Sequence, residues 1–267
     1  MYSKFRLKHI SSTDFINYKQ IGTQLYKRCK TTIKQKLCDC IDEDGIIDGI
    51  QLQENWFPTT GKFNIFLSHS HNDEDAAVAL AGFLYQELNL TTFIDSCLWG
   101  YSNILLRSLD NKYCKKQSDK TLFDYDSRNY STSHVHMMLS VALMNMIDEC
   151  ESVFFFDTPK SISLQDAISE EITGSPWIYN ELSIVNKIRV CPLDTYRNKK
   201  EIFEHAASGM ESLQIEYNVS GILKNFTPLT ICTLQQWAKN FSLHKEKYRN
   251  SLDCLYQMIA EQNELLG

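Results

Sequence analysis

The sequence predicts an α/β protein in which a central parallel sheet is flanked by helices. Short apolar strands alternate with amphipathic helices along most of the chain, a pattern typical of βαβ units. The clearest unit joins an apolar strand at 63–68, a helix with 3.6-residue apolar spacing, and a second strand at 90–95. With 267 residues and 43% hydrophobic composition, the chain is long enough to bury a sizeable core.

The first sixty residues are expected to form an accessory helical region. Two modest amphipathic segments, near 13–29 and 31–41, are followed by a polar stretch that contains glycine. A cluster of breakers at 57–61, with proline and glycine, then separates this region from the first predicted strand. We therefore place a domain boundary near residue 60.

The loops that follow the first two predicted strands are expected to lie together. Asp73 or Asn72 is placed to cap the helix after the first strand. Because the carboxyl ends of parallel strands meet at one edge, residues 68–74 and 95–103 share that edge. Open α/β sheets bind their ligands there, so this edge is the predicted location of a site.

The second half of the chain continues the same alternation. Residues 111–131 turn polar and are interpreted as a surface insertion, after which Ser133 is placed to cap a strongly amphipathic helix. The elements expected after it are a fully apolar third strand at 152–157, a fourth at 188–193, a fifth at 229–232, and helices at 234–242 and 246–262.

The helix that begins near Ser175 carries the most informative pattern. Ser175 suits the N-cap and Pro176 the first helical position. Trp177 and Glu181 then share one face, which Ile184 continues as an apolar stripe. A carboxylate beside such a stripe is paired, solvated through a cleft, or functional. Glu181 is therefore the candidate catalytic residue, and the alternative is a solvated helix residue that happens to follow a tryptophan.

The bulk composition limits the classes of partner and compartment. A formal net charge of -6 and a pI near 5.7 give no general attraction to nucleic acid or to anionic membranes. The first residues lead into no apolar segment, and no uncharged apolar run is long enough to span a bilayer. The nine cysteines form no secreted disulfide framework, so we expect reduced thiols and a cytoplasmic protein. The spacing of Cys38 and Cys40 fits no zinc site, so no metal is expected.

Three stretches of the chain resemble one family. Phe66-Leu67-Ser68-His69-Ser70 precedes an acidic helix start, Phe93-Ile94-Asp95 is followed by Trp99-Gly100, and Ser175-x-Trp177-x-x-x-Glu181 comes third. In order and spacing they resemble the first strand and loop, the second strand and BB loop, and the active-site helix of the Toll/interleukin-1 receptor (TIR) domain. The similarity extends over about residues 62 to 235 and is closest to the bacterial TIR proteins that consume NAD.

The resemblance implies a flavodoxin-like TIR fold with a helical N-terminal extension. The implied domains are an accessory region at 1–60, a TIR domain at 61–235 with its insertion at 111–131, and C-terminal helices at 236–267 packed on it. Some family members place arginines after the first strand, whereas this chain has Ser70 and His71, so phosphate contacts are not carried over.

The resemblance also implies roles for individual residues. Glu181 is implied to be catalytic, and Asp95 fits a cap at a strand end as well as a substrate contact. Trp177 fits a core position as well as a pocket wall, and the two loop histidines fit surface positions as well as ligand contacts. The implied substrate-binding residues are Ser68, His69, Ser70, His71, Asp95, Trp99 and Trp177.

The implied activity is that of an NAD+ nucleosidase or cyclase that cleaves the bond between nicotinamide and ribose. NAD is then a substrate, no cofactor is required, and the second product is ADP-ribose, a cyclic ADP-ribose isomer or an ADP-ribose conjugate. Because nicotinamide departs as a neutral molecule, one carboxylate facing the oxocarbenium-like centre suffices. The resemblance further implies homo-oligomers, a role in bacterial antiviral immune signalling, and a downstream effector protein that senses the product.

Two other functions are consistent with the same residues. A non-catalytic TIR interaction scaffold would assemble with a partner through the BB-loop region, where Trp99 and Tyr101 lie in the sequence. A nucleotide sensor would bind NAD or ADP-ribose without turnover. Substitution of Glu181 distinguishes the enzyme from the scaffold and the sensor, because only the enzyme depends on this residue for NAD cleavage.

Overall fold

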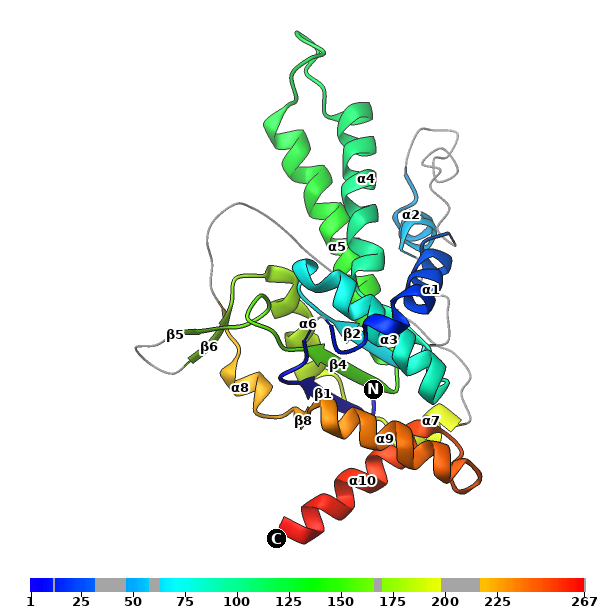
Figure 1. Cartoon of the computed structure of the whole chain (residues 1–267). Helices are drawn as coiled ribbons and strands as arrows, with labels where there is room; N and C mark the ends of the chain where they lie inside the picture. The colour runs from blue at the N-terminus through cyan, green and yellow to red at the C-terminus, as the bar shows by residue number, and fades with distance from the viewer. Residues whose placement is uncertain (12, 32–46, 58–62, 166–169, 198–216, 267) are drawn as a thin grey trace.

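A computed structural model of the chain describes residues 1–11, 13–31, 47–57, 63–165, 170–197 and 217–266. Its centre is a five-stranded sheet flanked by helices (Figure 1). In sheet order the strands are β3 (Thr92–Ile94), β2 (Ile65–Ser68), β4 (Ser152–Phe156), β1 (Ser3–Leu7) and β8 (Thr227–Leu229). All four pairings are parallel, which confirms the expected α/β class with a central parallel sheet.

The order β3-β2-β4 is compatible with a flavodoxin-like sheet. The chain runs from β2 to the neighbour on one side, β3, and then crosses to the other side as β4. The place where the direction reverses, between β2 and β4, is a topological switch point, and ligands of open α/β sheets bind outside the carboxyl ends of the strands there.

Strand β1 corrects the expectation of a purely helical N-terminal region. It lies inside the sheet between β4 and β8, with Phe5 and Leu7 buried. Interior parallel strands are usually continuous apolar runs, but Lys4 and Arg6 interrupt this one, so its sequence did not indicate a strand. Arg6 is nevertheless buried, because its guanidinium donates hydrogen bonds to the carboxylates of Asp157 and Glu171.

The same strand explains why the expected fourth strand at 188–193 is wrong. β1 already pairs with the free edge of β4, and residues 188–192 have no regular structure before the short helix α7 (Leu193–Arg197). The expected fifth strand is shifted: β8 ends at Leu229, and Thr230 caps the helix that follows.

Helices surround the sheet and a small antiparallel sheet adjoins it. The remaining helices and turns are η1 (Ile16–Tyr18), α1 (Lys19–Thr31), α2 (Gly49–Trp56), η3 (His71–Asp73), α3 (Glu74–Leu88), α4 (Ser96–Tyr113), α5 (Tyr125–Glu149), α6 (Pro176–Lys187), α8 (Ser220–Leu223), α9 (Ile231–Leu243), η4 (Lys245–Lys247) and α10 (Ser251–Leu266). The small sheet contains β5 (Ser163–Gln165), β6 (Glu170–Thr173) and β7 (Tyr217–Asn218). Most of the predicted helix at 31–41 lies outside the described residues.

A long helical hairpin replaces the predicted BB loop and most of the polar insertion. Asp95 accepts a hydrogen bond from the backbone N–H of Ser96, so α4 begins immediately after β3 and the expected loop at 95–103 is wrong. α4 and α5 then run side by side away from the sheet (Figure 1). Asp124, and not Ser133, caps α5, so only a short connection remains of the insertion.

None of the helices in the described part of the chain is long and apolar enough to cross a membrane.

Candidate active site

The candidate site lies at the carboxyl edge of the sheet, beside the switch point. Ser68 is the last residue of β2, Asp95 directly follows β3, and Glu181 comes from the second turn of α6. The start of α6 is as predicted, because the side chain of Ser175 accepts a hydrogen bond from the N–H of Ile178 and Pro176 occupies the first turn. The register of this helix turns Glu181 toward the sheet.

Glu181 is buried, with only 1% of its surface exposed. The Ser68 hydroxyl donates a 2.6 Å hydrogen bond to Oε2, and Oε1 has no hydrogen-bond partner among the described residues. Burial, followed by the charge of Asp95, raises the pKa of Glu181 well above its usual range, against the opposing effect of the Ser68 hydrogen bond. Glu181 is therefore not a solvated helix residue, and its surroundings in this conformation favour the protonated, neutral carboxyl group.

Asp95 and His69 form a second fully buried pair beside Glu181. The Asp95 carboxylate accepts hydrogen bonds from the backbone N–H groups of His69, at 3.2 Å, and Ser96, at 2.7 Å. His69 Nδ1 lies 2.5 Å from Asp95 Oδ1, although the ring N–H does not point along this line well enough for a regular hydrogen bond. Burial, the largest single influence, lowers the pKa of His69, but the charge and close contact of Asp95, together with the charges of Glu74 and Asp73, outweigh burial and raise it. The cap role predicted for Asp95 is confirmed.

The aromatic residues predicted for the site are distributed differently. Trp99, on the first turn of α4, stacks on the ring of His69 with 5.6 Å between centroids and 14° between planes. His71 is exposed and lies at the edge of this pair, 6.3 Å from the Trp99 ring. Trp177 packs instead against His136 of α5, at 5.2 Å. Ser70 is buried, and its carbonyl accepts the N–H of Asp73. The structure thus joins Ser68, His69, Asp95, Trp99 and Glu181.

Three residues that were not predicted for the site bridge the switch point. The Thr158 hydroxyl donates to Asp73 Oδ2 at 2.5 Å, and Lys160 Nζ donates to Asp73 Oδ1 at 2.8 Å. We call these residues the switch-point bridge. Asp73 was predicted to cap α3, but its carboxylate makes no capping hydrogen bond and turns to these partners instead. No local pattern indicates such a bridge, because Asp73 and Thr158 are 85 residues apart.

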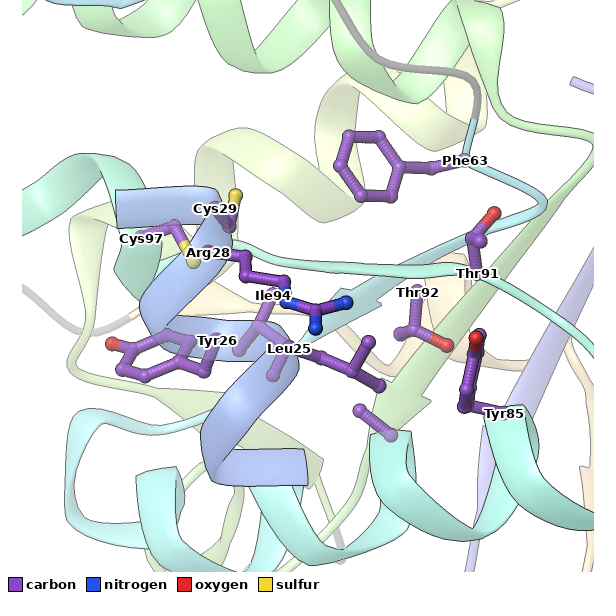
Figure 2. Close-up of a pocket in the computed structure, with 11 residues that line it drawn as sticks. Leu25, Tyr26, Arg28, Cys29, Phe63, Tyr85, Thr91, Thr92, Ile94 and Cys97 are labelled. Carbon is purple, nitrogen blue, oxygen red and sulfur yellow. The ribbon is translucent and has the colours of Figure 1, made fainter. Parts of the chain in front are cut away.

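Two cavities in the described part of the structure lie away from the candidate site. One of about 270 Å³ is bounded by α1, α3, β3 and the start of α4, and Figure 2 shows Arg28 of α1 extending into it toward Thr92. Another of about 840 Å³ lies between α2 and the α4–α5 hairpin. No residue predicted for the site lines either cavity. The site around Glu181 is closed in this conformation, because its carboxyl group is buried.

Within the described residues, no three His, Cys, Asp or Glu side chains are arranged to hold a metal ion. Comparisons of the chain with protein-family models, with curated proteins and with solved structures gave no match.

Proposed function

We propose that this protein is a TIR-type enzyme that cleaves the nicotinamide–ribose bond of NAD+, with Glu181 as the catalytic carboxylate. One observation carries the proposal: Ser68, Asp95 and Glu181, which are distant in sequence, converge at the carboxyl edge of a parallel sheet beside its switch point. Perturbed, buried carboxyl groups at such an edge are typical of functional sites. Each of the three TIR-like stretches supplies one of these residues.

The chemistry assigns a simple role to Glu181. Nicotinamide leaves with the electron pair of the broken bond, and the ribose carbon becomes an oxocarbenium-like centre. An ionised Glu181 stabilises that positive charge and holds the ribose hydroxyls. Water then adds to the carbon and releases a proton, which gives ADP-ribose. An adenine nitrogen, a ribose hydroxyl or an added nucleophile gives a cyclic isomer or a conjugate instead.

The closed site implies a resting state. A carboxyl group that is 1% exposed cannot contact NAD, so the packing around Glu181 must open before reaction. We expect this step to separate the β2–α3 segment, which follows Ser68, from the β4–β5 segment to which it is bridged. Assembly of several protomers is the opening step that the TIR resemblance suggests. In that setting the enzyme would act in bacterial antiviral immunity, with its product read by a downstream effector protein.

The test is nucleotide chromatography with mass detection on concentrated protein incubated with NAD. We expect nicotinamide release from the wild-type protein and a loss of about 100-fold or more in Glu181→Gln, since one preorganised electrostatic contact has this effect. Glu54→Gln, which makes the same change at an exposed position of α2, should retain full activity. Full activity in folded Glu181→Gln, or no release at any protein concentration, would exclude the proposal.

One observation favours the alternative of an interaction scaffold. The α4–α5 hairpin exposes aromatic surface near its end, where Tyr125 is 66% and Tyr130 is 70% exposed. Trp99 and Tyr101 no longer support this alternative, because Trp99 stacks on His69 and Tyr101 is buried. The scaffold predicts that Tyr125→Ser with Tyr130→Ser abolishes assembly in analytical ultracentrifugation while Glu181→Gln has no biological effect. The enzyme predicts that Glu181→Gln alone is inactive.

A further inference from the structure

We propose that Asp95 and His69 are positioning residues that control the charge of Glu181, and that neither residue contacts the substrate. His69 acts as a buried cation that holds a negative charge on Asp95, and Asp95 in turn opposes a second negative charge on Glu181. This inference rests on the proposed function, but its main measurement does not require turnover.

The geometry of Asp95 separates it from substrate binding. None of its surface is exposed, and both carboxylate oxygens are already occupied by protein groups. One oxygen accepts the N–H of Ser96 and lies against His69 Nδ1, while the other accepts the backbone N–H of His69. Two contacts with His69, in the loop after β2, and one with Ser96, the first residue of α4, determine the orientation of this carboxylate. A carboxylate held in this way is a fixed charge beside Glu181.

The charged groups around His69 and Asp95 indicate which of the two carboxyl groups, Asp95 or Glu181, carries a proton. Asp95 is the nearest carboxylate to His69, while Asp73 and Glu74 act from farther away. Lys160 pairs with Asp73, and Tyr26 donates a hydrogen bond to Glu74, so both already have partners. Glu181 faces Asp95 and the Ser68 hydroxyl. In the proposed arrangement, two buried carboxyl groups share one buried imidazolium. We expect Glu181 to keep the proton, because its Oε1 has no hydrogen-bond donor among the described residues.

The two substitutions are expected to change Glu181 in opposite directions. His69→Gln removes the cation and leaves the charge of Asp95 unbalanced, so the pKa of Glu181 should rise further. Asp95→Asn removes the nearest negative charge, so the pKa of Glu181 should fall. A charge within about 4–6 Å of a titrating group shifts the pKa of that group by about one unit or more. If His69 and Asp95 were purely structural residues, the two substitutions would not shift the pKa of Glu181 in opposite directions.

The experiment is a ¹³C NMR titration of glutamate side-chain carboxyl groups, with the Glu181 signal assigned by its loss in Glu181→Gln. We expect the apparent pKa of Glu181 to be highest in His69→Gln, intermediate in the wild type and lowest in Asp95→Asn. Exposed changes of the same kind, His244→Gln and Asp194→Asn, should leave it unchanged. A ¹⁵N titration of His69 in the wild-type protein should find a charged imidazole above its ordinary pKa, and this measurement remains informative if a variant does not fold.

The pH dependence of nicotinamide release provides the link to catalysis. Because ionised Glu181 is the active form, the rate of nicotinamide release should fall on the acid side of its pH profile. The pH at which this fall occurs should be higher in His69→Gln and lower in Asp95→Asn than in the wild type. The inference would be overturned if His69→Gln and Asp95→Asn shifted the apparent pKa of Glu181 equally or in the same direction. A neutral His69 in the wild-type protein would overturn it as well. If the Glu181 titrations shift in opposite directions but neither the wild-type protein nor any variant cleaves NAD, the positioning role of His69 and Asp95 stands and the proposed function fails.

Discussion

At the residue scale, the buried proton of Glu181 couples folding to pH. The pKa of Glu181 is raised in the folded protein, so the folded state retains a proton that the unfolded state releases. The stability from this proton is fully present below the unfolded pKa and is lost as the pH rises through the folded pKa. His69 acts in the same direction, because its pKa is also raised. Stability should therefore decline from mildly acid to mildly alkaline pH.

Replacing Glu181 with a neutral isostere tests this coupling. Glu181→Gln cannot ionise, so it should gain stability over the wild type as the pH rises, by about 2 °C or more in Tm near pH 8.5 and much less near pH 5. Scanning calorimetry across this range measures the difference, with Glu54→Gln as the matched control. Parallel Tm profiles for wild type and Glu181→Gln would mean that the carboxyl group is hydrated in the folded protein.

At the element scale, the packing of α1 on α3 depends on two glycines. A Cβ atom at Gly22 would collide with the carbonyl oxygen of Val78, and one at Gly82 with that of Tyr18. Backbone atoms cannot move aside as a flexible side chain can, so both positions require the absence of a side chain. The close approach of the two helices holds α1 beside the β3 edge of the sheet.

Gly22→Ala should therefore destabilise the protein by about 3 kcal/mol, at the upper end of the range for overpacking. Gly100→Ala is the control, because its Cβ in α4 would meet nothing within 4 Å. Removal of a helical glycine there should stabilise by about 0.5–1 kcal/mol. Urea unfolding measures both, and a Gly22→Ala variant as stable as wild type would contradict the close approach.

At the scale of the whole molecule, the switch-point bridge joins the β2–α3 segment, which begins directly after Ser68, to the β4–β5 segment. Lys160 also donates a hydrogen bond to the backbone carbonyl of Asn72, at 2.8 Å, so the β4–β5 segment is tied to the β2–α3 segment by charged and backbone contacts. The β2–α3 segment follows directly after Ser68, the hydrogen-bond partner of Glu181, so we expect it to move when the site opens. Loss of the bridge should therefore favour the open state.

Thr158→Val combined with Lys160→Ala should open this region more often. Loss of about 1.5 kcal/mol of charge-assisted hydrogen bonding predicts roughly tenfold faster amide exchange at 69–73 and 157–162. Nicotinamide release at a given protein concentration should rise with it. Lys187→Ala, an exposed change on α6, is the control. Unchanged exchange in both segments would show that the bridge does not limit opening.

The sequence was most informative where a signal is local. The strands at 63–68, 90–95 and 152–157, the amphipathic α3 and the capped start of α6 all correspond to described elements. β1 was missed because Lys4 and Arg6 break the apolar run, and the charge of Arg6 is tolerated only through Asp157 and Glu171. The helical start of α4 was missed because the residues after β3 were assigned to the loop expected at the carboxyl end of a parallel strand.

The sequence by itself determined the class of the sheet and the face of α6 on which Glu181 lies, since caps and apolar periodicity act within a few residues. Only the tertiary structure decided that Glu181 is closed off, that His69 and Asp95 stand beside it, and that β1 completes the sheet. These outcomes depend on contacts such as that of Ser68 with Glu181, 113 residues away. Burial and charge balance arise from such distant neighbours, and no local pattern encodes them.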